Sequence, residues 1–118
     1  MIRKVAFTVY PVRDMDRARR FYEQGLGLQV SDQYEGMWIE YEAGGGVLAL
    51  TNTPELGRPA ADAGGTIAFE VDDVDALTAR LREQGATVLS EPMATPVCRM
   101  SVVADPEGNA VILHRVND

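Results

Sequence analysis

The residue with the widest choice of chemistry in this chain is its only histidine, His114. Three glutamates in strand-like stretches, Glu40, Glu42 and Glu70, can supply a carboxylate beside it. Histidine side chains titrate near neutral pH, so His114 is a candidate for ligand binding or for proton transfer. The alternative is a partly solvated histidine at the end of a strand, with no chemical role.

The only tryptophan, Trp38, lies two residues before Glu40, and alternate residues of a strand share a face. An indole ring stacks on planar or cationic groups, and a carboxylate beside it provides the countercharge. The pair therefore indicates a site for an aromatic or cationic ligand. The alternative is that Trp38 fills a hydrophobic gap while Glu40 points to solvent.

The lone cysteine, Cys98, excludes an internal disulfide and a zinc site built from cysteines. A catalytic thiol would need a base beside it, and His114 is the only histidine that could serve as one. A small buried hydrophobic residue is the simpler interpretation of Cys98.

An internal repeat indicates how these residues are positioned. "VAFTV" at 5–9 returns as "IAFEV" at 67–71, "EQG" at 23–25 returns at 83–85, and "GGGVLAL" at 44–50 aligns with "EGNAVIL" at 107–113. Three matches in the same order indicate a duplicated unit of about 60 residues, with a small insertion in the first copy.

Each copy reads as a strand, a helix and three more strands. Asp14 is a candidate N-cap for the first helix and Asp72 or Asp73 for the second, while Gly25 and Gly85 end them. The later strands are expected at about 28–34, 37–43 and 46–52 in the first copy, and at 87–91, 98–104 and 109–116 in the second.

The sequence therefore predicts an α+β fold, with two tandem βαβββ modules whose curved sheets form a cup. The modules are expected at 1–52 and 66–118, within one structural domain. Residues 53–65, rich in Pro, Gly and Ala, read as the linker between them. A concave space between two sheets suits a small molecule.

Strand alternation predicts which side chains face the cup. The residues expected to face the helices are Val5, Phe7, Val9, Ile67, Phe69 and Val71, and those expected to face the cup are Ala6, Thr8, Tyr10, Thr66, Ala68 and Glu70. The repeat also pairs Trp38 with Met100 and Thr51 with His114. The candidate ligand-binding residues are therefore Tyr10, Trp38, Glu40, Thr51, Thr66, Met100 and His114.

Charge and hydropathy limit the partners of this chain. Its formal charge of −7 opposes binding to nucleic acid, which needs clustered Lys and Arg. No apolar stretch approaches the roughly 20 residues that span a bilayer, and the N-terminus has no cleavable signal pattern. We therefore expect a cytoplasmic protein whose partner is a small molecule, with neither nucleic acid nor membrane involved.

Three segments resemble the vicinal oxygen chelate superfamily, which includes glyoxalase I, bleomycin-resistance proteins and extradiol dioxygenases. They are "VRDMDRARRFYEQGLGL" at 12–28, "GGTIAFEVDDVDAL" at 64–77 and "DPEGNAVIL" at 105–113. The first is similar to the family pattern V-x-D-x-x-x-A-x-x-FY-x-x-x-LG, and the last to DP-[DE]-GN-x-[IV]-x-[LF]. The resemblance covers essentially the whole chain and implies the same fold.

The resemblance also implies where a divalent metal would lie. Enzymes of this superfamily hold the metal with His and Glu from the first and last strands of each copy. The matching positions here are Thr66 and Ile112 in the second copy and Ala49 in the first, with Phe7 or Lys4 as the fourth. These side chains do not form a set of metal ligands, so we expect no metal and no cofactor.

Two functions of different classes remain open. One is a metal-free binding protein, similar to bleomycin-resistance proteins, whose crevices use two chains and so imply a homodimer. The other is a glyoxalase- or dioxygenase-like enzyme (a lyase, isomerase or oxygenase) with a displaced site that uses His114 and a glutamate of the cup, Glu40 or Glu70. A regulatory subunit with a closed cup is a third, weaker possibility.

Overall fold

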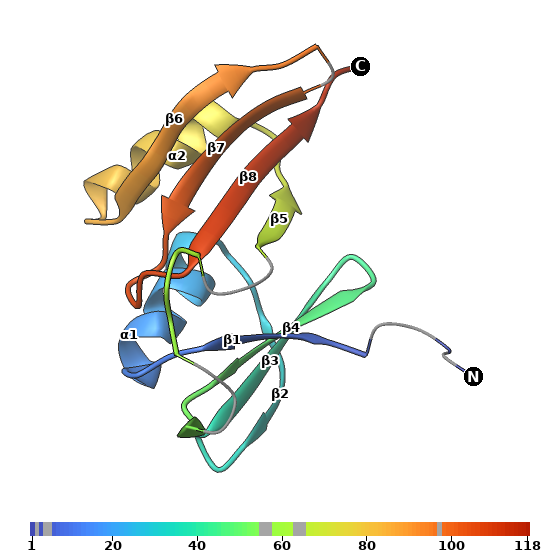
Figure 1. The fold of residues 1–118 in the computed structure, drawn as a ribbon, viewed down its shortest axis with the longest axis vertical. Coiled ribbons are helices and arrows are strands. Elements are labelled where there is room, and N and C mark those ends of the chain that lie inside the picture. The colour runs from blue at the N-terminus through green and yellow to red at the C-terminus, as the bar shows by residue number, and fades with distance from the viewer. Residues whose placement is uncertain (2, 4–5, 55–57, 63–65, 97) are drawn as a thin grey trace. The chain divides into compact units, whose positions relative to one another are not determined.

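The computed structural model describes residues 1, 3, 6–54, 58–62, 66–96 and 98–118, so the expectations for Lys4, Val5 and parts of the linker lie outside it. The chain divides into two compact units, residues 1–59 and 60–118. Each unit contains one four-stranded mixed sheet, in the order β1-β4-β3-β2 and β5-β8-β7-β6 (Figure 1). The predicted fold class, an α+β fold of two similar βαβββ modules, is confirmed.

The elements follow the predicted order in both units. The first unit contains β1 (Thr8–Pro11), α1 (Met15–Arg19), the π-helix η1 (Arg20–Gly25), β2 (Val30–Tyr34), β3 (Trp38–Ala43) and β4 (Gly46–Thr51). The second contains β5 (Ile67–Glu70), α2 (Val74–Glu83), β6 (Thr87–Ala94), β7 (Cys98–Ala104) and β8 (Ala110–Val116). Over the described residues, no helix is long and apolar enough to cross a membrane.

The helices begin where the sequence predicts. The Asp14 carboxylate accepts a hydrogen bond from the backbone N–H of Arg17, and the Asp73 carboxylate accepts one from Ala76, both at 3.0 Å. Asp73, and not Asp72, is therefore the cap of α2. The wider turn of η1 was not predicted, because its sequence has ordinary helical periodicity.

The strand register is equivalent in the two units. Pro11 pairs with Thr51, and Glu70 pairs with His114. In both units one further bond of 2.8 Å ends the parallel pairing, from Val12 N to the Thr51 carbonyl and from Val71 N to the His114 carbonyl. Thr8, three residues after Val5, is thus the structural counterpart of Ile67.

This register corrects the faces predicted for the first strand. Tyr10 pairs with Leu50, next to Ile39, on the face that meets the helix, and its side chain is buried. Phe7 lies on the opposite face, where its ring contacts Trp38. The alignment was wrong by three residues, an odd number, and an odd shift moves every side chain to the other face. The faces predicted for β5 are confirmed by the pairing of Phe69 with Leu113.

Aromatic packing and one carboxylate hold η1 on the first sheet. Tyr22 and Tyr41 are fully buried and stack with ring centroids 6.1 Å apart. The Tyr41 hydroxyl donates to Glu23 at 2.8 Å, and Arg19 pairs with the same carboxylate. Burial, followed by the bond to Glu23, raises the pKa of Tyr41. Partial burial acts to raise the pKa of Glu23, but the bonds from Arg19 and Tyr41 outweigh it, so that pKa falls.

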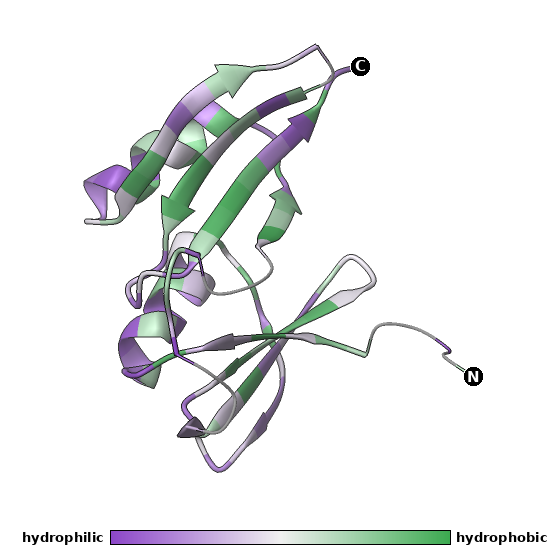
Figure 2. Cartoon of the chain, viewed as in Figure 1, coloured by the Kyte–Doolittle hydropathy of each residue, from purple (hydrophilic) through white to green (hydrophobic). Residues whose placement is uncertain are grey.

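A buried hydroxyl pair joins α2 to the second sheet. The Thr78 hydroxyl bonds the Val74 carbonyl at 2.6 Å and lies 2.8 Å from the Ser101 hydroxyl, with both side chains inaccessible to solvent. Ser101 therefore marks the helix-covered face of β7, which Figure 1 shows in front of α2. Apolar side chains of β7 and β8 surround the pair, and Figure 2 shows long hydrophobic stretches in both strands.

The predicted "DPEGN" turn joins β7 to β8 through a buried carboxylate. Asp105 accepts hydrogen bonds from the backbone N–H groups of Glu107 and Asn109, both at 2.9 Å, and from the Asn109 amide at 3.0 Å. Gly108 has a φ of 90°, which favours glycine. The Asn109 side-chain oxygen also accepts a bond from Ala60 N, so the same turn anchors the start of the unit.

Replacement of Asp105 is expected to destabilise the second unit. Asp105→Ala leaves buried donors without an acceptor and should lower the free energy of unfolding by about 3 kcal/mol in urea titrations followed by circular dichroism. Asp105→Asn keeps one oxygen for the two backbone donors and loses only the bond from the Asn109 amide, so it should cost less. Equal losses in the two variants would contradict the role given to the backbone bonds.

The hydroxyl pair should behave as a coupled unit. Thr78→Val and Ser101→Ala are each expected to cost about 1–2 kcal/mol of unfolding free energy. Thr78→Val leaves the buried Ser101 hydroxyl without this partner, whereas Ser101→Ala removes one of the two bonds of the Thr78 hydroxyl and leaves its bond to the Val74 carbonyl. The double variant should cost about 1 kcal/mol less than the sum of the two. Ser101→Ala combined with Thr53→Val, a hydroxyl of the first unit, serves as the control and should be additive. Additivity in both pairs would mean that the 2.8 Å contact has no energetic weight.

Candidate functional site

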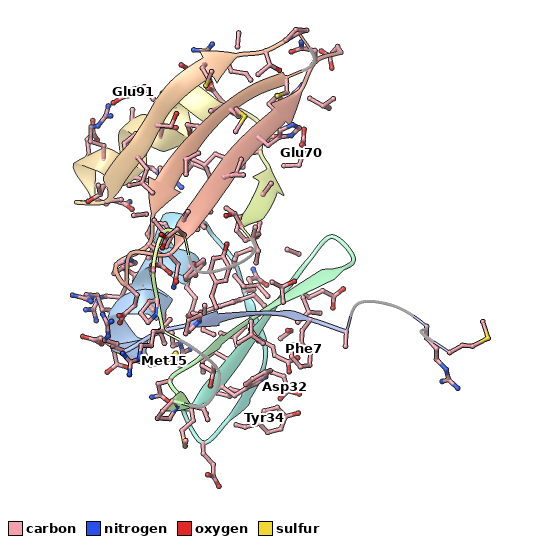
Figure 3. All side chains as sticks on the ribbon, in the orientation of Figure 1. Phe7, Met15, Asp32, Tyr34, Glu70 and Glu91 are labelled. Carbon is pink, nitrogen blue, oxygen red and sulfur yellow. The ribbon has the colours of Figure 1, made fainter. Side chains whose placement is uncertain are left out.

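The sheet face opposite the helix in the first unit presents aromatic rings beside carboxylates. The register places Asp32 against Glu40 and Tyr34 against Trp38 on this face. The Phe7 ring meets the Trp38 ring edge-on, with centroids 5.1 Å apart. Figure 3 labels Phe7, Asp32 and Tyr34 on this side of the sheet. These five residues form what we call the aromatic–acidic face.

Hydrogen bonds fix the orientation of the two carboxylates on the aromatic–acidic face. The Trp38 indole N–H donates to Glu40 at 2.7 Å, and the Tyr34 hydroxyl donates to Asp32 at 2.9 Å. The bond to Asp32 raises the pKa of Tyr34. No Lys or Arg among the described residues forms an ion pair with Glu40 or Asp32. The face therefore offers aromatic surface and negative charge to a ligand.

The other candidates in the first unit lie deeper. Thr51 is on the same face as Trp38 but is fully buried, where its hydroxyl donates to the Met37 carbonyl at 2.9 Å and contacts Thr53. Tyr10 lies on the helix side. The first unit thus brings Trp38, Glu40 and Thr51 to one face and places Tyr10 on the other.

The corresponding face of the second unit carries a histidine held by a carboxylate. His114 Nδ1 lies 2.6 Å from Glu70 Oε1, and Glu70 Oε2 accepts the backbone N–H of Val116 at 2.8 Å. The bond from Val116, followed by that from His114, lowers the pKa of Glu70, which Figure 3 labels at the end of β5. Because Nδ1 faces Glu70, Nε2 is the ring nitrogen that can act on a ligand.

Met100 pairs with His114 on this face, as Trp38 pairs with Thr51 in the first unit, which agrees with the equivalences of Trp38 with Met100 and of Thr51 with His114 expected from the repeat. Thr66 is exposed just before β5. The bonds from His114 to Glu70 and from Trp38 to Glu40 were not predicted, although all four residues were named. Strand alternation identifies a shared face, but a contact between two strands also requires their register.

The positions that would hold the family metal do not fit a divalent ion. Ala49 pairs with Val9 and Glu40, and Ile112 pairs with Ala68 and Val102, so both point away from the helices but carry no donor atom. Phe7 offers only a ring and Thr66 one hydroxyl. Over the described ranges, no three His, Cys, Asp or Glu side chains converge as a metal site.

A separate hollow of about 250 Å³ lies along α1 and η1, lined by Asp16, Arg19, Arg20, Glu23 and Gln24. Its walls are mostly polar, and Arg19 is bonded to Glu23 at 2.7 Å. These contacts serve to dock the helix on the sheet, as described for Tyr41.

Comparisons with known proteins agree with this fold. The model of the Glyoxalase/Bleomycin resistance protein/Dioxygenase superfamily matches residues 4–113. A probable lactoylglutathione lyase from Vibrio parahaemolyticus is 28% identical, with 93% of this chain and 88% of that protein aligned.

Two solved structures illustrate the range of related functions. A glyoxalase-related enzyme from Fulvimarina pelagi is 25% identical, with a TM-score of 0.80 over 97% of this chain and 88% of that one. TnmS3, an antibiotic binding protein from Streptomyces sp. CB03234, is 30% identical, with a TM-score of 0.79 over 98% of both chains. Enzymes and binding proteins thus share this architecture, and the chain belongs to the Glyoxalase/Bleomycin resistance protein/Dioxygenase superfamily.

Proposed function

We propose that this protein is a small-molecule-binding protein that holds an aromatic or cationic ligand and is free of a divalent metal at the family's positions. The observation that carries the proposal is the aromatic–acidic face, where Trp38 and Phe7 offer ring surface beside Glu40. The 30% identity to an antibiotic binding protein supports binding without turnover. The resemblance to bleomycin-resistance proteins adds a homodimer to the proposal, which light scattering would test.

Because Trp38 is the only tryptophan, its fluorescence reports on the proposed site directly. Planar aromatic cations, neutral aromatics of the same shape and alkylammonium ions form a suitable panel. A planar cation should quench Trp38 and raise the melting temperature. Glu40→Gln keeps an acceptor for the indole but removes the charge, and should weaken cation binding about tenfold while leaving neutral aromatics unaffected.

Glu83→Gln, on the exposed surface of α2, removes the same charge and is the matched control. If it weakens binding as much as Glu40→Gln, the effect comes from net charge and not from the site. A panel in which no compound changes the fluorescence or the melting temperature would contradict the proposal.

The metal-free part of the proposal has its own test. Untagged protein purified without chelators should carry less than about a tenth of an equivalent of Ni, Zn, Mn or Fe by mass spectrometry, since Ala49 and Ile112 cannot ligate a divalent ion. Adding these ions should leave the melting temperature unchanged. One equivalent of any of these four metals per chain would contradict the metal-free part of the proposal and would favour a metalloenzyme instead.

A second candidate function is an enzyme that uses His114 with Glu70, and the 2.6 Å bond between them is the observation that favours it. A carboxylate on Nδ1 holds the ring in place and leaves Nε2 as a general base, as in other carboxylate–histidine pairs. The relative from Vibrio parahaemolyticus, named as a probable lactoylglutathione lyase, supports a test of lyase activity.

The first reaction to assay is the interconversion of lactoylglutathione with glutathione and the corresponding 2-oxoaldehyde, started from glutathione and the aldehyde and followed by the absorbance of the thioester that forms. If the enzyme function holds, His114→Ala should lower turnover about 100-fold or more, and Glu70→Gln should lower it less. Glu91→Gln, on an exposed part of β6, is the control and should retain full activity. Equal turnover by His114→Ala and the unmodified protein would exclude this role for His114.

A further inference from the structure

Four side chains form a row across the second sheet. Met93 of β6 pairs with Met100 of β7, Met100 pairs with His114 of β8, and His114 pairs with Glu70 of β5. Residues paired in this way project from the same face of a sheet, and neighbouring Cβ atoms lie about 4.5–5.5 Å apart. We call Met93, Met100 and His114 the methionine–histidine row.

The row lies on the face away from α2. Ser101, the neighbour of Met100 in β7, points to the helix, where it meets Thr78. Met100 therefore points to the other side. Met93 is 49% exposed, and the side chains of Met100 and His114 are partly accessible, so a small ion can reach the row from solvent.

The donor atoms of the row are soft. Two thioether sulfurs and one imidazole nitrogen suit a soft monovalent ion, whereas carboxylates and water suit Mg²⁺ or Mn²⁺. Thioethers carry no proton to lose, so they are ready ligands at any pH. The carboxylate that faces His114 is bonded to Nδ1 and not aimed at the sulfurs.

Glu70 gives His114 the environment of a metal-ligating histidine. The Glu70 carboxylate lies 2.6 Å from His114 Nδ1. Glu70 is on β5, which borders β8 on the side opposite β7 and Met100. The Val116 N–H holds the second oxygen of Glu70 at 2.8 Å, which fixes the carboxylate in turn. A carboxylate bonded to the other ring nitrogen is the usual support of a histidine ligand, because it sets both the tautomer and the ring orientation.

The surroundings of the row favour an ion of low charge. Ala68, Ile112 and Val102 lie in the next row on the same face and supply apolar surface, while the adjacent pair on the other side of the row is Cys98 with Val116. The basic residues of β7 and β8 point to the helix side of the sheet. Arg99 pairs with Asp75 on α2, and Arg115 bonds the Asp72 carbonyl. The row is therefore free of direct cationic competitors from β7 and β8.

We propose that the methionine–histidine row binds one Cu(I) ion through the two thioether sulfurs and His114 Nε2, with Glu70 as the positioning residue. This site is separate from the aromatic–acidic face and does not depend on the proposed ligand-binding function. It also differs from the family's divalent metal positions, since Thr66 and Ile112 are not part of it.

The test is an anaerobic titration with Cu(I) in competition with a colorimetric Cu(I) chelator. The lone thiol, Cys98, also binds Cu(I) in principle, so the titration is done in the Cys98→Ser background. One equivalent should bind in this background. Loss of Cu(I) binding on Cys98→Ser alone would overturn the proposal, because it would assign the ion to the thiol.

Variants of the row should weaken binding in a defined order. Glu70→Gln should reduce the Cu(I) affinity about tenfold or more, the range expected when the partner of a ligating histidine is altered. Met100→Leu and His114→Ala each remove a donor atom and should reduce it further. Met37→Leu removes an exposed methionine of the first unit and should leave the affinity unchanged. Unchanged affinity in both Met100→Leu and His114→Ala would refute the site.

A second, spectroscopic experiment tests which methionines bind the ion without relying on measured affinities. The chain has five methionines, whose methyl groups are resolved by carbon–proton correlation spectra of methyl-labelled protein. Ag(I), a diamagnetic analogue of Cu(I), should shift the Met93 and Met100 methyl signals and leave those of Met1, Met15 and Met37 in place. Zn²⁺ should shift none of them, because thioethers are poor ligands for it. Shifts confined to other methionines would contradict the proposal.

Discussion

The register of the parallel strand pair in each unit decides which side chains the open faces present. Val12 N–H bonds the Thr51 carbonyl, and Val71 N–H bonds the His114 carbonyl, each at 2.8 Å. These bonds continue the pairing of β1 with β4 and of β5 with β8 by one residue, and the side-chain period of a strand is two. A slip of one residue would send Glu70 to the helix side and away from His114. The chemistry of both faces therefore depends on a main-chain contact in which no side chain takes part.

The same constraint explains how far the sequence predicts this structure. The repeat, the helix caps at Asp14 and Asp73, and the later strands depend on local patterns, and the structure confirms them. The faces of β5 follow from its alternation. The faces of β1 were wrong because "VAFTV" resembles "IAFEV" more closely than its true counterpart, which begins at Thr8. Identity between short segments is a weaker guide to register than the spacing back from a helix cap.

The candidate sites were predictable only in part. Trp38 and Glu40 share a face because they are two residues apart in one strand, which the sequence alone indicates. Glu70 and His114 are far apart in the chain and meet only through the pairing of β5 with β8. Met93 lies in the methionine–histidine row because the register of β6 against β7 shifts between Ser90 and Met93. Such a bulge changes the alternation without a clear sequence signal.

The two units have kept one backbone and diverged in what it presents. Trp38 and Met100 occupy equivalent places, as do Thr51 and His114, yet one face became aromatic and acidic while the other became rich in sulfur and imidazole. Main-chain pairing permits this, because it fixes where a side chain points and not what it is. The equivalent positions Ala49 and Ile112 both carry apolar side chains on these faces. A duplicated scaffold can therefore keep one main-chain pairing and still present a different set of side chains on each face.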